Sequence, residues 1–254
     1  MNTASKSTPR LIGVGTGPGD PELLTLKAVK ALRSADVVAH FAKQGNAGNA
    51  RAIVEGHIRP DAIELPLLYP VTTEIHRHAD GYTSRIGAFY EESAAAVAAH
   101  LDRGATVAVL SEGDPLFYGS YMHLHVRLAG RFPTEVIPGV TAMSGCWSQA
   151  GVPIVQGDDI LTVLPGTLDE AELARRLADT EAAVIMKVGR NLPKIRAALA
   201  LAGKLDHAIY VERGTMANTR HMPLAAKTDE DAPYFSIVLV PGWHGRAPAA
   251  KAAE

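Results

Sequence analysis

Apolar and polar residues alternate between two patterns along the chain. Short apolar runs typical of strands are separated by longer segments in which apolar residues recur at helical spacing. In the first half this pattern predicts strands at 11–14, 36–40, 62–65, 106–110 and 134–137, with helices at 22–33, 49–56 and 81–103. Strands that alternate with helices in this way are typical of a mainly parallel sheet covered by helices.

The pattern changes after the pair Pro138 and Gly139. The second half is predicted to contain helices at 140–151, 169–179 and 192–203 and strands at 160–164, 182–187, 207–212, 219–223 and 234–240. Short connections separate the last three strands, which indicates partly antiparallel pairing. The sequence therefore predicts two α/β domains, 10–137 with a mainly parallel sheet and 138–244 with a mixed sheet, and disordered tails at 1–9 and 245–254.

Composition narrows the class of protein. A chain of 254 residues with 47% hydrophobic residues can build a large core, and its net charge of −2 gives no basic field that would attract nucleic acid or a membrane surface. Cys146 is the single cysteine, so the chain has neither an internal disulfide nor a cysteine-based zinc site, and we expect no bound metal. The polar segment 1–10 does not resemble a signal peptide, and no apolar run is long enough for a membrane helix. We expect a cytoplasmic protein that acts on a small molecule.

Two glycine turns follow predicted strands. Four glycines, at 13, 15, 17 and 19, are expected to form the first turn because glycine tolerates positive φ and close approach, and residues 112–115 form the second. Ligands of α/β proteins bind at the carboxyl ends of strands, so the two turns predict one shared site. Pro18 stands where a dinucleotide fingerprint needs its third glycine, which disfavours a nicotinamide oxidoreductase even though Asp36 could bind a ribose. A tight turn without a ligand is the alternative.

Five motifs carry a resemblance to a known family. The segments GVGTGPGDPELLTLKA, SEGDPLFYGS, IPGVTAMSGCWSQAGVPI, AAVIMKVGRN and IYVERGTM follow one another in the order and approximate spacing of the tetrapyrrole methylases, over roughly residues 10–242. The chain therefore resembles that family along nearly its whole length.

The resemblance implies a fold, a cofactor and a reaction. It implies a homodimer of two-domain subunits that binds S-adenosylmethionine and a tetrapyrrole in the cleft between the domains. The segments LLYPVTTE and APYFSIVLVPGW are most similar to members that methylate precorrin-2 at carbon 20. A cobalt-containing ring or another ring position is the alternative within the family. A non-catalytic tetrapyrrole carrier would need neither glycine turn.

Residues expected to line the cofactor site follow from the same resemblance. They are Pro18, Glu112, Gly113, Asp114, Phe117, Thr141, Ala142, Met186, Arg213, Gly214, Ser236 and Ile237. Glu112 departs from close relatives, which often have glycine there. Asp114 is also the candidate catalytic residue, with three roles open: a ligand of the cofactor's ammonium group, an acceptor of the proton that the methylated ring loses, or an Asx-type turn former.

Substrate charge suggests a second group of candidates. A uroporphyrinoid carries eight carboxylate side chains, so its binding surface should present basic residues. The candidates for substrate binding are Arg77, Tyr118, Lys187, Arg190 and Arg220, and further basic residues are His78, Arg85, Arg213 and His221. Tyr118 and Tyr121 are each expected either to pack on the face of the ring or to belong to the core.

Overall fold

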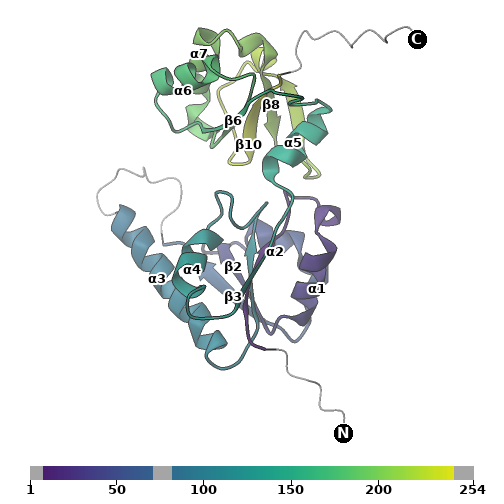
Figure 1. Cartoon of the computed structure of the whole chain (residues 1–254), viewed down its shortest axis with the longest axis vertical. Helices are drawn as coiled ribbons and strands as arrows, with labels where there is room; N and C mark the ends of the chain where they lie inside the picture. The colour runs from purple at the N-terminus through teal and green to yellow at the C-terminus, as the bar shows by residue number, and fades with distance from the viewer. Residues whose placement is uncertain (1–7, 71–81, 243–254) are drawn as a thin grey trace, which may run out of the picture. The chain divides into compact units, whose positions relative to one another are not determined.

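The computed structural model describes residues 8–70 and 82–242, without the side chains of Tyr82 and Thr83. These residues form two compact units that meet in sequence between Thr141 and Ala142, each with its own five-stranded sheet (Figure 1). The domain limits expected from the sequence, 10–137 and 138–244, remain predictions. Arg77, His78 and the tail 245–254 lie outside the described residues, as do residues 1–7 of the other expected tail.

The first sheet is wholly parallel. Its strands are β1 (Leu11–Gly15), β2 (Val37–Ala42), β3 (Ile63–Leu68), β4 (Val107–Ser111) and β5 (Thr134–Ile137), in the order β3-β2-β4-β1-β5. The central strands β1 and β4 are buried along their whole length, which explains their continuous apolar runs. The predicted parallel sheet is confirmed.

Helices cover both faces of this sheet. They are α1 (Leu26–Ser34), α2 (Asn49–Ile53), α3 (Tyr82–Leu101) and α4 (Tyr121–Leu128), with 3-10 turns η1 (Pro21–Leu23) and η2 (Glu55–His57). Helices α3 and α4 pack on one face through residues such as Val97 and Leu124, and α1 and α2 pack on the other through Leu32 and Ala50. The helical spacing of Tyr121, Leu124 and Leu128 marks α4 in the sequence, although no range was predicted for this helix.

The second sheet is mixed. Its strands are β6 (Leu161–Pro165), β7 (Ala182–Met186), β8 (Ile209–Glu212), β9 (Arg220–Pro223) and β10 (Ser236–Val240), in the order β6-β7-β10-β8-β9. Strands β6 and β7 are parallel, whereas β10 is antiparallel to both β7 and β8, and β8 is antiparallel to β9. The predicted antiparallel pairing of the last three strands is confirmed.

The second sheet is also covered on both faces. Helix α5 (Ala142–Ala150) packs on one face through Cys146, while α6 (Glu170–Ala178) and α7 (Leu192–Leu201) pack on the other through Leu173 and Ile195 (Figure 1). Short 3-10 turns are η3 (Gly189–Asn191), η4 (Leu205–His207) and η5 (Leu224–Ala226). Within the described ranges we find no helix that combines the length and the apolar character needed to span a membrane.

Gly13 provides a test of the first core. It lies in β1, where a Cβ atom would collide with the ring of Tyr121, a side chain with 0% exposure. We expect Gly13→Ala to lower the free energy of unfolding by about 1–3 kcal/mol, the usual cost of overpacking a core. Gly87→Ala is the matched control, since a Cβ on this glycine of α3 meets nothing within 4 Å.

Urea unfolding of both variants measures the difference. Alanine is favoured over glycine within helices, so the control should keep or raise stability. Equal stability of Gly13→Ala and the unsubstituted protein would contradict the observed packing of α4 on β1.

Candidate functional site

The two glycine turns lie side by side at the carboxyl edge of the first sheet. Strands β1 and β4 are parallel neighbours, so the loops that follow them begin at the same edge. The Gly17 N–H donates to the Gly113 carbonyl at 3.3 Å, and the Gly113 N–H donates to the Gly17 carbonyl at 2.8 Å. The structure thus brings together the two turns that the sequence analysis assigned to one site.

Two of the four glycines have a different role from the one expected. Gly13 and Gly15 belong to β1 and do not adopt positive φ, so they are not part of the turn. A Cβ on Gly15 would lie 2.5 Å from the Gly139 nitrogen and 2.8 Å from the Gly113 carbonyl oxygen. Gly15 is therefore required for close backbone packing, while Gly17 at φ 76° and Gly113 at φ 63° supply the left-handed turns.

Asp114 joins two of these loops. Its Oδ1 accepts a hydrogen bond from the Leu116 N–H at 2.9 Å, and its Oδ2 accepts one from the Gly139 N–H at 3.2 Å. The first bond is the Asx-type turn considered above, and the second ties the loop after β4 to the loop after β5. Each oxygen retains a second lone pair, so turn formation leaves room for a cation or a proton. The ligand and catalytic roles remain predictions.

The side chain of Glu112 is held by α2. Burial raises the pKa of its carboxyl group, against the opposing effect of hydrogen bonds from the Asn49 side chain and the Ala50 N–H. These bonds come from the first turn of α2, where backbone N–H groups lack partners within the helix. The Glu112 carboxyl group is thus engaged inside the first unit, and its expected part in cofactor binding remains a prediction.

The other candidates of the first unit surround this edge. Pro18 is half-buried directly after Gly17, and Thr141 is the last residue of the unit. Phe117 and Tyr118 contact edge to face, with ring centroids 4.9 Å apart. Tyr118 is 45% exposed, so the alternative that its ring belongs to the core is wrong.

One edge of the second sheet gathers most candidates of the second unit. The register pairs Glu212 with Ser236 on one side and with Arg220 on the other, and it pairs Ile185 with Val238. The carboxyl ends of β7 and β8 and the amino ends of β9 and β10 therefore lie together. The candidates at this edge are Met186, Lys187, Arg213, Gly214, Arg220, Ser236 and Ile237.

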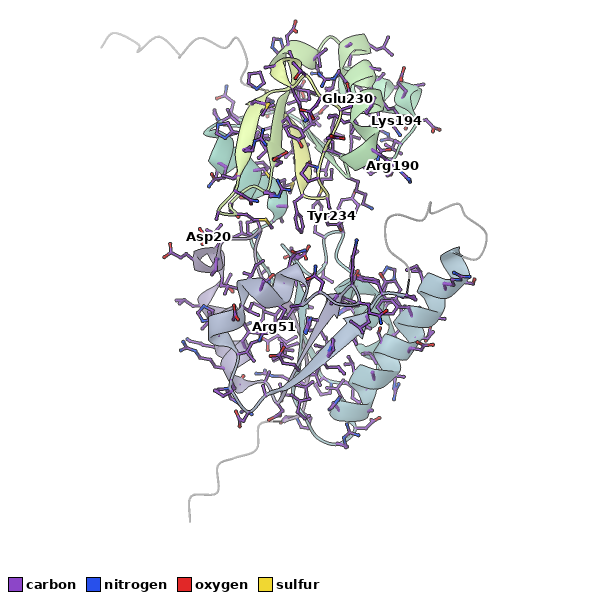
Figure 2. All side chains as sticks on the ribbon, turned by 180° about the vertical axis from the view of Figure 1, so that it is seen from behind. Asp20, Arg51, Arg190, Lys194, Glu230 and Tyr234 are labelled. Atoms are coloured by element: carbon purple, nitrogen blue, oxygen red, sulfur yellow. The ribbon has the colours of Figure 1, made fainter. Side chains whose placement is uncertain are left out.

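Arg190 belongs to the exposed surface of the same unit. It lies in η3, and its side chain projects outward beside Lys194 (Figure 2). Arg190 follows Lys187 by three residues. Its role in substrate binding remains a prediction.

The candidates of the second unit divide between the two faces of its sheet. Ala142, Met186 and Ile237 pack with Cys146 on the α5 face, where a Cβ on Gly214 would lie 2.6 Å from the Cys146 Sγ. Ser236 lies on the opposite face, and its hydroxyl is 2.8 Å from the Pro233 carbonyl oxygen and 3.0 Å from the Tyr210 hydroxyl. The α5 face thus offers apolar groups, whereas Ser236 is engaged within the unit.

Strained backbone marks several of these positions. Among the described residues, the non-glycine residues with positive φ are Tyr118, Lys187, Arg213 and Thr215, at φ 55°, 57°, 50° and 67°. Each such conformation costs about 1–3 kcal/mol and is typical of functional loops. The first three are also candidate site residues from the sequence.

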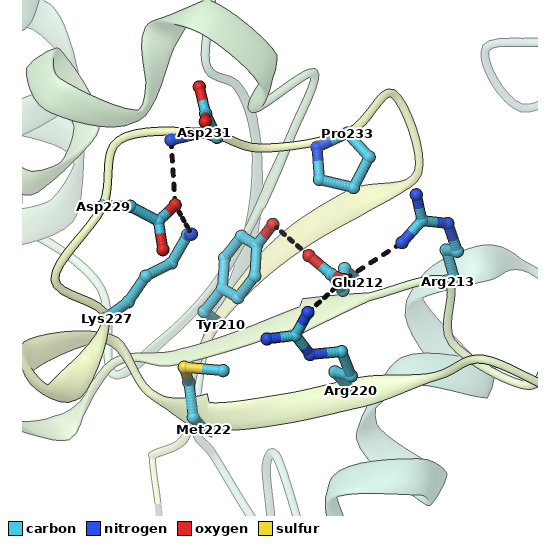
Figure 3. Close-up of a pocket in the computed structure, with 9 residues that line it drawn as sticks. All are labelled: Tyr210, Glu212, Arg213, Arg220, Met222, Lys227, Asp229, Asp231 and Pro233. Carbon is cyan, nitrogen blue, oxygen red and sulfur yellow. Dashed lines mark hydrogen bonds and ion pairs between the residues drawn. The ribbon is translucent and has the colours of Figure 1, made fainter.

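A polar pocket of about 260 Å³ lies beside this edge (Figure 3). It is lined by Tyr210, Glu212, Arg213, Arg220, Met222, Lys227, Asp229, Asp231 and Pro233. The Tyr210 hydroxyl donates to Glu212 Oε2 at 3.0 Å, and Arg213 Nη1 donates to Glu212 Oε1 at 3.0 Å. Burial, with Glu212 close by, raises the pKa of Tyr210 to about 12, which keeps this hydroxyl a donor.

Sequence reasoning selected Arg213 and Arg220 from this pocket and missed Tyr210, Glu212 and Lys227. The signal for Glu212 was its place at the end of the apolar strand IYVE.

The profile of the Tetrapyrrole (Corrin/Porphyrin) Methylases matches residues 10–227. The chain belongs to this family.

Individual relatives agree with the family assignment. The chain is 73% identical over 237 residues to the precorrin-2 C(20)-methyltransferase of a Sinorhizobium species. The aligned region covers 93% of this chain and 97% of the relative. A cobalt precorrin-4 methyltransferase superposes with a TM-score of 0.70 at 22% identity, over 91% of this chain and 94% of that chain.

A third similarity comes from a complex. The uroporphyrin-III C-methyltransferase of Thermus thermophilus with S-adenosyl homocysteine has a TM-score of 0.62 at 23% identity, over 91% of this chain and 96% of that chain. The resemblance inferred from the five motifs and the α/β fold class are thereby confirmed, while the roles of individual site residues remain predictions.

Asp114 can be tested for its structural role in this methylase. An asparagine side chain has one acceptor oxygen, so Asp114→Asn must lose the bond to Leu116 or the bond to Gly139. We expect the free energy of unfolding to fall by about 1–3 kcal/mol. Asp102→Asn is the control, because its side chain is 60% exposed and lies 4.0 Å from Arg131.

Urea unfolding compares the two variants. The control should change stability by no more than about 0.5 kcal/mol. A similarly small change for Asp114→Asn would show that the two backbone bonds do not stabilise the loops.

Proposed function

We propose that this protein is an S-adenosylmethionine-dependent C-methyltransferase that methylates precorrin-2 at carbon 20 and gives precorrin-3A in cobalamin biosynthesis. The observation that carries the proposal is the 73% identity to a precorrin-2 C(20)-methyltransferase over nearly the full length of both chains. The glycine turns and the strained loops at the strand ends support a ligand site in each unit.

The residues of the chain fit such a cofactor. Adenosine needs apolar surface with nearby backbone, and Ala142, Met186 and Ile237 supply apolar side chains on the α5 face next to Gly214. In the first unit, main-chain groups of Gly113 and Gly139 lie so close around Gly15 that this edge presents backbone rather than side chains. We assign the other cofactor candidates to the same ligand: Pro18, Glu112, Gly113, Asp114, Phe117, Thr141, Arg213 and Ser236.

The sulfonium of S-adenosylmethionine supplies an electrophilic methyl group, so the protein has to orient two ligands and exclude water. The meso carbon of the precorrin ring is an electron-rich, enamine-like nucleophile, and attack does not wait for a base. We therefore favour Asp114 as a ligand of the ammonium group over Asp114 as the acceptor of the ring proton. Both roles use lone pairs that the backbone bonds leave available.

Substrate binding is assigned to basic and aromatic residues. Arg77, Lys187, Arg190 and Arg220 are the proposed anchors for ring carboxylates, and the exposed ring of Tyr118 is proposed to pack on the macrocycle. We also propose that the enzyme is cytoplasmic and forms a homodimer, and sedimentation equilibrium measures its oligomeric state.

Cofactor binding gives the first functional test. Calorimetry should show S-adenosyl homocysteine binding at one site per chain and no heat with NAD, because Pro18 interrupts the dinucleotide fingerprint. Gly15→Val should abolish this binding, since its side chain would displace the backbones of Gly113 and Gly139. A folded Gly15→Val that binds normally, or tight binding of NAD, would contradict the assignment.

Mass spectrometry of products then separates the candidate substrates. Precorrin-2 should gain one methyl group, and the cobalt-containing ring should react more slowly. Preference for the cobalt ring, or methylation at another ring position, would favour the alternatives within the family.

Substrate anchors give a further prediction. Neutralising a true anchor, in Lys187→Gln, Arg190→Gln or Arg220→Gln, should raise KM for precorrin-2 by an amount equivalent to about 1.5–3 kcal/mol, because a charge-assisted hydrogen bond is lost. The affinity for S-adenosyl homocysteine should not change. Arg175→Gln on α6 is the control, as this arginine is 63% exposed and paired with Glu172. Unchanged kinetics in all three variants would place the substrate surface elsewhere.

A further inference from the structure

Glu212 is a buried charge to which the proposed function gives no role. Its side chain is 9% exposed, although it ends a strand beside an open pocket. A buried carboxylate is costly unless other groups neutralise it and donate hydrogen bonds to it. The residues around Glu212 therefore indicate what the charge is for.

Strand register places these residues on one face of the sheet. Ser236 and Arg220 are the cross-strand neighbours of Glu212, and Tyr210 lies two residues before it on the same strand. Residues directly opposite on neighbouring strands have Cβ atoms about 4.5–5.5 Å apart, which brings their side chains into contact. Glu212 thus lies between a hydroxyl-bearing side and a cationic side.

The carboxylate of Glu212 accepts hydrogen bonds from two neighbours and forms only an ion pair with the third. Tyr210 and Arg213 donate hydrogen bonds to separate oxygens, each at 3.0 Å. Arg220 Nη1 is 3.7 Å from Glu212 Oε1, which is an ion-pair distance but too long for a hydrogen bond, and its side chain is 67% exposed. A guanidinium has five N–H donors, so Arg220 is oriented by Glu212 without using its donors on it.

The remaining charges of the pocket are placed apart from this group. Lys227 Nζ pairs with Asp229 Oδ1 at 2.5 Å and lies 4.9 Å from the centre of the Tyr210 ring. Asp231 lies on the far side of Tyr210 from Arg220, and its backbone N–H donates to Asp229 (Figure 3). The end of the pocket formed by Glu212, Arg213 and Arg220 therefore carries one net positive charge.

We propose that Glu212, itself held by hydrogen bonds from Tyr210 and Arg213, is a positioning residue that orients the guanidinium group of Arg220 so that the pocket binds one carboxylate side chain of the tetrapyrrole. This inference rests on the proposed function for the identity of the substrate. A pocket of about 260 Å³ is large enough to admit an acetate or propionate side chain. It is below the range of about 300–1,000 Å³ typical of pockets that enclose a whole small molecule.

Orientation outweighs the repulsion between Glu212 and a bound carboxylate. The hydrogen bonds from Tyr210 and Arg213 already compensate the charge of Glu212, whereas an arginine released from it gains rotamer freedom that must be lost again on binding. We therefore expect removal of the Glu212 charge to weaken substrate binding.

A double-mutant cycle tests the inference. KM and kcat for precorrin-2 are measured for the unsubstituted enzyme, Glu212→Gln, Arg220→Gln and the double variant, with S-adenosylmethionine shown to be saturating for each. We expect Glu212→Gln to raise KM about tenfold with little change in kcat, and to have no further effect when Arg220 is already glutamine. Arg175→Gln serves again as the control for loss of a surface charge.

Several outcomes would overturn the inference. An unchanged or lowered KM in Glu212→Gln would show that Glu212 does not position Arg220. An equal rise in KM with and without Arg220 would show a general structural role. If Glu212→Gln does not fold, Tyr210→Phe replaces it in the cycle, because it removes the bond to Oε2 and leaves every charge in place.

The same four proteins separate this inference from the proposed function. If the unsubstituted protein does not methylate precorrin-2, the proposed function fails. The pocket is then tested by binding of uroporphyrin III, which carries eight carboxylates, followed through quenching of tryptophan fluorescence. If Glu212→Gln weakens uroporphyrin III binding only when Arg220 is present, the proposed carboxylate pocket is supported. If the effect of Glu212→Gln on the dissociation constant does not depend on Arg220, the proposal is overturned.

Discussion

Close packing of three main-chain segments at the carboxyl edge of the first sheet is the constraint on which the candidate site of that unit depends. Gly15 ends β1 so close to Gly139 and Gly113 that no side-chain carbon fits between them. Paired hydrogen bonds between Gly17 and Gly113 then join the two turns, and Asp114 connects them to the loop after β5. The site is therefore positioned mainly by backbone, and a side chain completes it.

In the second unit, the alternation of side chains along the strands determines which candidate residues share a face of the sheet. Along β8, Val211 faces α5, whereas Tyr210 and Glu212 face the opposite side. The apolar candidates Met186 and Ile237 lie on the α5 face, while the charged pocket opens on the other. One strand end thus contributes to two chemically different surfaces, an apolar one and a charged one.

The sequence predicted the sheets well because buried strands leave continuous apolar runs, as in β1 and β4. No range was predicted for α4, although its buried Tyr121, Leu124 and Leu128 recur at helical spacing. The glycine turns could be found because they follow strands directly. The burial of Glu212 could not, because it depends on Arg220 and Ser236, which only the strand register brings to its sides. Gly13 was likewise misassigned, since the ring that excludes a Cβ comes from distant Tyr121.

The strained turns supply the last link between fold and chemistry. Lys187 and Arg213 directly follow β7 and β8 with φ of 57° and 50°, held by the bond from Asn191 Nδ2 to the Lys187 carbonyl and by that from the Arg213 N–H to the Phe235 carbonyl. Glycine would adopt these conformations without the cost of about 1–3 kcal/mol that other residues incur. The strain therefore favours an explanation in which the side chains themselves are used. Two strained residues with cationic side chains therefore follow β7 and β8 at one sheet edge.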